Sequence, residues 1–142
     1  MPSQALIQWR NERSKELDEI DAAHKAVGGT KRGRRFATRQ LNRAYAILLA
    51  SRFQGFCRDL HTECARLVIN RHVPASAGPI VLAQLTDNRQ LKRANAQPGS
   101  IGADFGRLGV RFWYDVLALD GKNKSIPRFI DGVERLAERD RP

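Results

Sequence analysis

The sequence predicts an all-α protein, folded as a bundle of four to five helices with one long central helix. Apolar residues recur at spacings of three and four along most of its 142 residues, which is the period of an amphipathic helix. No stretch alternates between apolar and polar residues as a half-buried strand does, and there is no internal repeat. The length suits one domain, which we assign to residues 1–142.

The first helix is expected between Ser3, whose side chain can cap it, and the Gly28-Gly29 pair, which accepts the left-handed conformation that ends a helix. Its apolar face is broken by two polar positions. That face carries Leu6, Trp9, Arg13, Leu17, Ile20 and His24.

The central helix is expected over residues 34–72, where the longest apolar stripe runs. Gly55 falls inside it, and a glycine within a helix costs about 1 kcal/mol relative to alanine. We therefore expect a neighbouring helix to approach closely at Gly55. The prolines and glycine of residues 73–79 end this helix. Its stripe consists of Leu41, Tyr45, Leu48, Leu49, Phe53, Phe56, Leu60, Cys64 and Leu67.

The remaining helices are predicted over residues 80–96, from Ser100 to Gly121, and from Ser125 onward. Ser100 and Ser125 can act as N-caps, and Pro127 is tolerated in a first helical turn. The helix after Ser100 has a clean stripe, and the last helix has a weak apolar face. These faces carry Phe105, Leu108, Phe112, Val116 and Leu119 in the first case, and Ile130, Val133 and Leu136 in the second.

Charge is distributed unevenly along the chain. Residues 22–58 hold nine basic and no acidic residues, so +9 of the net charge of +10 lies there. This asymmetry favours a polyanionic partner, with nucleic acid first among the candidates; the alternative is a basic helix surface without a partner. The spacing of these cations differs from that of a phosphate-binding P-loop, and their charge predicts binding to the phosphate backbone. The cations in question are Lys31, Arg32, Arg34, Arg35, Arg39 and Arg43.

Cys57, His61 and Cys64 share one side of the central helix but form an incomplete ligand set for zinc, so no metal and no cofactor is predicted. The two cysteines are about 10 Å apart along a helix, too far for a disulfide, and two free thiols fit a reducing cytoplasm. Beside them, Asp59 is expected to lie toward Gly55 or Glu63. We interpret this half of the helix as a solvated shoulder or a buried hydrogen-bonding strip rather than a catalytic cluster.

Arg66 and His72 are an arginine–histidine pair with five residues between them. An arginine can hold a phosphate, and a histidine can transfer a proton near neutral pH. Six residues along a regular helix leave the two about 120° apart, so they converge poorly unless the helix ends there. The alternative role is a helix C-terminus at which Arg71 and His72 complement the helix dipole. No apolar run reaches transmembrane length and no secretory signal is evident, so no membrane association is expected.

The segments LNRAYAILLASRFQGFCRDLHTECARLV (residues 41–68) and SIGADFGRLGVRFWYDVLALDGKNKS (residues 100–125) resemble helices of the HEPN superfamily. The resemblance covers most of the chain and rests on packing patterns. It implies a helical bundle that pairs as a homodimer. It also implies a metal-independent endoribonuclease of the kind found in toxin–antitoxin and defence systems, where an antitoxin-type protein is a partner.

The HEPN hallmark is an arginine, usually followed by a polar residue, and a histidine after four to six further residues on a C-terminal helix. Arg66 and His72 match this spacing, although Leu67 stands where a polar residue is usual and the pair lies on the central helix. No histidine follows His72. A shifted reading frame over residues 139–142 can encode Ala-Ile-Ala-His, which resembles the end of the hallmark and suggests a truncated relative.

Two functions follow as expectations. The first is an RNA-binding helical domain of a ribonuclease-type family whose own catalytic activity is open. The second is a non-enzymatic helical module for protein interaction or dimerisation, motivated by the wide apolar face of the central helix.

Overall fold

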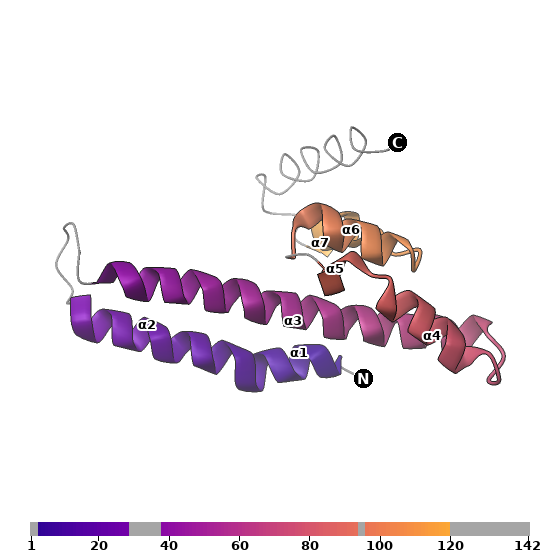
Figure 1. Cartoon of the computed structure of the whole chain (residues 1–142), viewed down its shortest axis with the longest axis horizontal. Helices are drawn as coiled ribbons and strands as arrows, with labels where there is room; N and C mark the ends of the chain where they lie inside the picture. The colour runs from indigo at the N-terminus through magenta and orange to yellow at the C-terminus, as the bar shows by residue number, and fades with distance from the viewer. Residues whose placement is uncertain (1–2, 29–37, 94–95, 120–142) are drawn as a thin grey trace. The chain divides into compact units, whose positions relative to one another are not determined.

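The computed structural model of the chain describes residues 3–28, 38–93 and 96–119, and every element within these ranges is helical (Figure 1). The predicted all-α class is therefore confirmed, and so is a long central helix, which ends at His72 as expected. The start of that predicted helix at residues 34–37 and the helix predicted after Ser125 lie outside the described residues. The elements are α1 (Gln4–Gln8), a π-helical segment η1 (Trp9–Arg13), α2 (Ser14–Gly28), α3 (Arg39–His72), α4 (Gly78–Asp87), α5 (Gln90–Arg93), α6 (Pro98–Gly106) and α7 (Phe112–Leu119).

The chain divides into two compact units, Met1–Glu63 and Cys64–Pro142, with the boundary inside α3. In the first unit, α1, η1 and α2 run alongside α3 in the opposite direction (Figure 1). The Ala5 backbone N–H donates to Glu63 Oε1 over 2.6 Å, and further along α2 the Glu16 carboxylate pairs with Arg52 Nε over 2.5 Å. Contacts made by later residues of the α1–α2 segment thus fall at earlier residues of α3, so the helices are antiparallel. A short connection favours this arrangement.

Aromatic rings fill the space between these contacts. The ring of Trp9 meets Phe56 at a centroid distance of 5.5 Å and Phe53 at 6.5 Å, the latter edge to face. Such tilted and edge-to-face pairs add about 0.5–1.5 kcal/mol to the burial of the rings. Leu17, one turn beyond Arg13, is buried as well. The apolar face predicted for the first helix is therefore the face that packs on α3.

The N-terminus of α1 is capped twice. Ser3 Oγ accepts a hydrogen bond from the Leu6 N–H over 3.2 Å, which confirms the predicted cap. The Glu63 carboxylate accepts the bond from Ala5, another of the N–H groups that a helix start leaves without a partner inside the helix. This cap comes from α3, so it also joins the two helices.

The buried side of α3 differs from the prediction in its second half. The buried residues there are Cys57, His61, Ala65 and Ile69, which follow each other at steps of four. Leu67, which the apolar stripe placed inside, has 70% of its surface exposed. The small residues Cys57 and Ala65 are fully buried, so the inner face does not follow the largest apolar residues of the helix.

The second unit departs from the prediction at two places. The helix expected over residues 80–96 is divided into α4, which starts earlier and has Pro79 in its first turn, and the short helix α5. The buried Asp104 carboxylate fixes the start of α5, because it accepts hydrogen bonds of 2.8 Å from the backbone N–H groups of Gln90 and Leu91. A carboxylate at a helix N-terminus is favoured by both charge and hydrogen bonding.

The single helix predicted after Ser100 is wrong. The chain forms α6 and α7 instead, with Ser100 buried inside α6 rather than capping it. Gly109 adopts φ +75° between them, and the Val110 N–H donates to the Phe105 carbonyl over 3.1 Å, as in a glycine-terminated helix end. The turn brings Phe112 back onto Phe105, with ring centroids 4.7 Å apart. In the described ranges, no helix has the length and apolar character needed to cross a membrane.

Candidate nucleic-acid interface

The first turns of α3 carry two of the cations that the sequence singles out. Arg39 and Arg43 are both exposed, and because they are four residues apart they lie on one face of the helix. Lys31, Arg32, Arg34 and Arg35 precede them in the sequence and lie outside the described residues. Two arginines on one exposed helical face can each hold a phosphate with two parallel hydrogen bonds.

Other cations of the acid-free segment are neutralised by α2. Lys25 pairs with Asp21 over 2.6 Å, and the hydrogen bond and charge of Asp21 raise the pKa of Lys25. Arg52 pairs with Glu16 over 2.5 Å. Arg39 and Arg43, in contrast, form no ion pair with any other residue of the described ranges. Of the described cations in residues 22–58, Arg39 and Arg43 thus keep exposed charge that no ion pair with a described residue neutralises.

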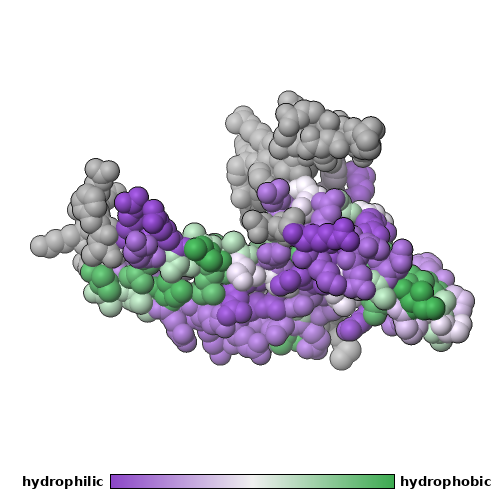
Figure 2. Space-filling model, in the orientation of Figure 1, coloured by the Kyte–Doolittle hydropathy of each residue, from purple (hydrophilic) through white to green (hydrophobic). Residues whose placement is uncertain are grey.

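Exposed apolar side chains accompany these cations. Ile47, one turn beyond Arg43, has 71% of its surface exposed, and Leu49 and Val27 have 38% and 57%. Figure 2 shows hydrophilic and hydrophobic surface next to each other over this end of the α2–α3 pair. Isolated exposed apolar side chains are common in proteins, and Ile47 and Leu49, two residues apart on α3, lie on nearly opposite sides of that helix.

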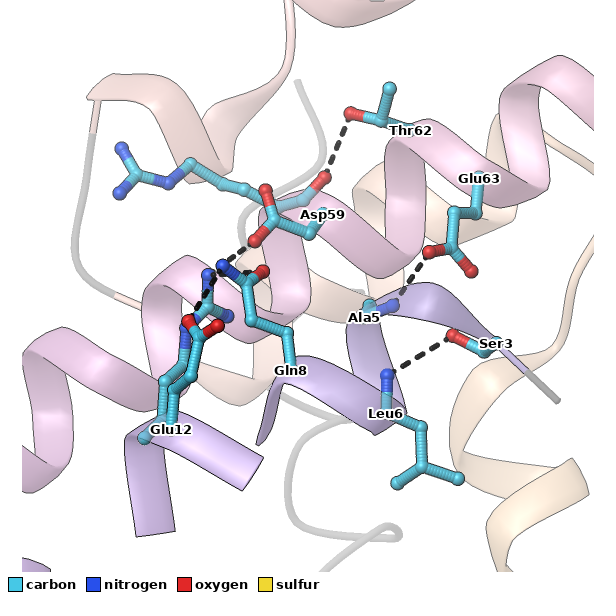
Figure 3. A network of polar contacts seen from close by, with 10 residues as sticks. Ser3, Ala5, Leu6, Gln8, Glu12, Asp59, Thr62 and Glu63 are labelled. Carbon is cyan, nitrogen blue, oxygen red and sulfur yellow. Dashed lines mark hydrogen bonds and ion pairs between the residues drawn. The ribbon is translucent and has the colours of Figure 1, made fainter. Parts of the chain in front are cut away.

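A second polar cluster, drawn in Figure 3, joins η1 to α3. Arg13 Nη2 donates to Asp59 Oδ2 and, over 3.4 Å, to Gln8 Oε1. Gln8 Nε2 in turn donates to Glu12 Oε2 over 3.2 Å. Asp59 lies toward Gly55, one of the two directions expected, and its partner there is a guanidinium from another helix. The sequence offered one signal for this contact: Arg13 occupies a position on the apolar face of the first helix.

Gly55 lies against the Arg13 guanidinium. A Cβ placed on Gly55 would lie 3.5 Å from Arg13 Cζ, an ordinary van der Waals distance. The neighbour at Gly55 is thus a side chain that leaves space for a Cβ, and the predicted close approach of a neighbouring helix stays a prediction.

The Arg13 cluster stabilises the packing of η1 on α3 rather than binding a ligand. The Arg13 side chain is 14% exposed and Asp59 is 46% exposed, so the positive charge is largely buried while its counter-charge stays partly hydrated. Arg13 Nη1 is buried without a hydrogen-bond partner. A buried guanidinium whose charge is already neutralised offers little attraction to a further anion. The cluster thus holds η1 against α3, and the anion-binding capacity lies at Arg39 and Arg43.

Cys57, His61 and Cys64 do not form a reactive centre. Cys57 is fully buried, and burial raises the pKa of its thiol to about 11, so it stays protonated at neutral pH. His61 is 1% exposed, in line with the buried-strip interpretation rather than the solvated shoulder. Both cysteines are free thiols. No group of three or more metal-ligating side chains comes together in the part of the chain that the structure describes.

Arg66 and His72 are both exposed on α3. The helix continues without a break to His72, so the two residues lie about 120° apart around its axis and do not converge on one face. Arg71 and His72 occupy the last turn, where positive charge complements the helix dipole. One chain therefore does not bring the predicted pair together.

Comparison of the sequence and structure with models of known protein families, with curated proteins and with solved structures finds no match.

Proposed function

We propose that this chain is an RNA-binding helical domain that holds the phosphate backbone with cations at and before the start of α3. The observation that carries the proposal is the contrast within the acid-free segment. Lys25 and Arg52 are neutralised by α2, whereas Arg39 and Arg43 are exposed and form no ion pair with another described residue. The sequence places four more cations within the eight residues before Arg39.

The chemistry of these groups favours backbone contacts over base recognition. Lysine and arginine bind phosphates by charge, and each contact releases a condensed counterion, so affinity falls as salt rises. Phosphate contacts position a protein on nucleic acid without reading its sequence. Binding through this surface is therefore expected to vary little with base sequence.

A charge-reversal experiment with a matched control tests the proposal. The double variant Arg39→Glu, Arg43→Glu changes the net charge by four, and the control Arg10→Glu, Lys15→Glu changes it equally at two exposed positions on η1 and α2. Fluorescence anisotropy with a labelled RNA should show at least a tenfold loss of affinity for the first variant only. Equal losses of affinity in both variants would mean that net charge alone sets RNA affinity, and would reject a specific binding surface at Arg39 and Arg43.

The HEPN resemblance leads us to propose that the domain is of a ribonuclease type, acting in the cytoplasm in a toxin or defence setting. In that case Arg66 would hold the scissile phosphate and His72 would transfer the proton, without a metal. The test is cleavage of RNA in the presence of EDTA, with His72→Ala as the variant and His24→Ala as the control. Cleavage that survives His72→Ala, or depends on added metal, rejects this assignment.

The second candidate function is a helical module for dimerisation or for binding another protein, such as an antitoxin-type partner. The exposed side chain of Ile47, with 71% of its surface accessible, favours it. Under this alternative, Ile47→Glu abolishes self-association or partner binding, and charge reversal at Arg39 and Arg43 leaves it intact. Under the RNA proposal, charge reversal at Arg39 and Arg43 weakens RNA binding more than Ile47→Glu does.

A further inference from the structure

The described part of the second unit has a basic surface of its own. Residues 64–119 contain seven basic and three acidic residues. Two of the three acids are engaged: Asp104 is buried against backbone N–H groups, and Asp87 pairs with Lys92 over 2.6 Å. The exposed charge of these helices is therefore positive. This is not evident from the charge distribution of the whole chain, in which residues 22–58 hold most of the net charge.

An aromatic ring stands within this basic surface. Tyr114 on α7 is 41% exposed, and the guanidinium of Arg111 lies over its ring with Cζ 4.0 Å from the centroid. Arg111 is exposed and forms no ion pair within the described ranges. Arginine above an exposed aromatic ring is the combination that stacks with nucleic-acid bases while neutralising phosphate charge.

The surrounding contacts fix the position of α7. Trp113 Nε1 donates to the Pro98 carbonyl over 3.0 Å, and its ring lies 3.4 Å from where a Cβ on Gly102 would stand. Phe112 packs on Phe105 of α6. Residues Phe112 and Trp113 thus hold the helix inward, and Tyr114, next in sequence, is left at the surface. A ring fixed in this way loses little conformational entropy when a ligand stacks on it.

Arg107 adds a further cation on the other side of the turn. It follows α6, is exposed, and its Nη1 donates to the Asn88 carbonyl over 3.1 Å, which orients the guanidinium. Arg107 and Arg111 therefore flank the Gly109 turn, and Tyr114 follows one helical turn later. The contact of Arg111 with the ring of Tyr114 combines charge and an aromatic face, which suits a strand whose phosphates and bases are both accessible.

We infer that Tyr114 and Arg111 form a stacking platform for an unpaired base, and that the preferred ligand of this domain is single-stranded RNA. The inference rests on the proposed RNA binding and adds a preference that phosphate contacts at Arg39 and Arg43 do not supply. In a duplex the bases already stack on each other and are not available to a side chain, so the platform contributes only to single-strand binding.

The test compares Tyr114→Leu with Tyr114→Phe in the full chain. The ligands are a fluorescein-labelled 12-nucleotide RNA and the same strand in a duplex, at one fixed salt concentration. Loss of one base stack weakens single-strand binding by about tenfold, so Tyr114→Leu should show that loss, with binding of the duplex unchanged. Tyr114→Phe retains the stacking ring and should bind as the wild type does. Circular dichroism of each variant confirms that the helices are retained.

The outcomes separate this inference from the function on which it rests. Wild-type binding to RNA that is unaffected by Tyr114→Leu overturns the stacking platform and leaves RNA binding in place. An equal loss on single strand and duplex also overturns it, because the ring would then act without stacking on a base. No RNA binding by the wild type at low salt overturns the proposed function itself. As a second readout, a 4-thiouridine-containing strand should photo-crosslink to the peptide that spans Phe112–Leu119; crosslinks confined to other peptides contradict the inference.

Discussion

The Arg13–Asp59 pair predicts an unequal response to the loss of either partner. Asp59→Ala leaves the Arg13 guanidinium without its counter-charge in a position where the side chain is 14% exposed. Removing one partner of a fully buried pair costs about 3–5 kcal/mol, whereas pairs at the surface contribute about 0–1 kcal/mol. Asp59 is 46% exposed, so water can partly replace it, and we expect an intermediate loss of about 2 kcal/mol.

Arg13→Met has the opposite consequence for charge. It leaves the carboxylate of Asp59 in contact with water and keeps an unbranched side chain over Gly55. The free energy of unfolding should therefore fall by less than about 1 kcal/mol. The double variant should resemble Arg13→Met alone, because the charge that Asp59 neutralises is no longer there.

Urea denaturation followed by the fluorescence of Trp9 and Trp113 and by circular dichroism measures these losses. Asp21→Ala is the control, since it breaks a pair of which both partners are well exposed, and it should have little effect. If Arg13→Met destabilises the protein more than Asp59→Ala does, the guanidinium is not the buried partner and the reasoning fails. Equal effects of Asp59→Ala and Asp21→Ala would refute it as well.

Two further predictions concern the turn after α6 and the buried thiol. Gly109→Ala should lower the free energy of unfolding by about 1–2 kcal/mol, because φ is +75° there, whereas Gly106→Ala inside α6 should not; equal effects in thermal denaturation would contradict this. Burial raises the pKa of Cys57 from its ordinary 9.0 to about 11, so the unfolded state ionises first and stability declines as pH rises through that window. Urea denaturation at pH 10 should show a decline of about 1 kcal/mol that is absent from Cys57→Ala; the same decline in that variant would refute it.

Helical period alone predicts the class of this fold and the end of its long helix. Glycine and proline at residues 73–79 stop α3 where the pattern says they should. The period cannot show that α6 and α7 are separate, because Phe105, Leu108 and Phe112 keep helical spacing across the turn. The left-handed conformation of Gly109 is decided by the packing of Phe112 on Phe105, a contact between residues that a continuous helix would hold apart.

Helical period also fails to predict the inner face of α3 and the π-helical segment. Leu67 is more apolar than Ala65, yet Ala65 is buried and Leu67 exposed, because the two lie on nearly opposite sides of the helix and the side with Ala65 faces inward. Trp9, Arg13 and Leu17 follow each other at steps of four residues. A π turn contains more residues than an α turn, so this spacing keeps the three side chains on one face. The Arg13–Asp59 contact draws that face onto α3, and its partners lie 46 residues apart, beyond any local pattern.

For the candidate site, the sequence identifies the cations but only in part which of them are neutralised. Lys25 has Asp21 four residues before it, so the sequence indicates that pair, whereas Arg52 has the same local signal as Arg39 and Arg43 and only the structure pairs it with Glu16. The exposed ring beneath Arg111, that of Tyr114, stands outside the apolar stripe of its helix, and its contact with Arg111 is seen only in the structure.

The central claim is tested most directly by measuring RNA affinity of the wild-type chain as a function of salt concentration. Contacts from the six cations at and before the start of α3 predict a slope of log K against log salt of about −4 on single strands. The Arg39→Glu, Arg43→Glu variant should show a clearly shallower slope, and the Arg10→Glu, Lys15→Glu control should not. Affinity that does not change with salt, or no binding even at low salt, would contradict the account.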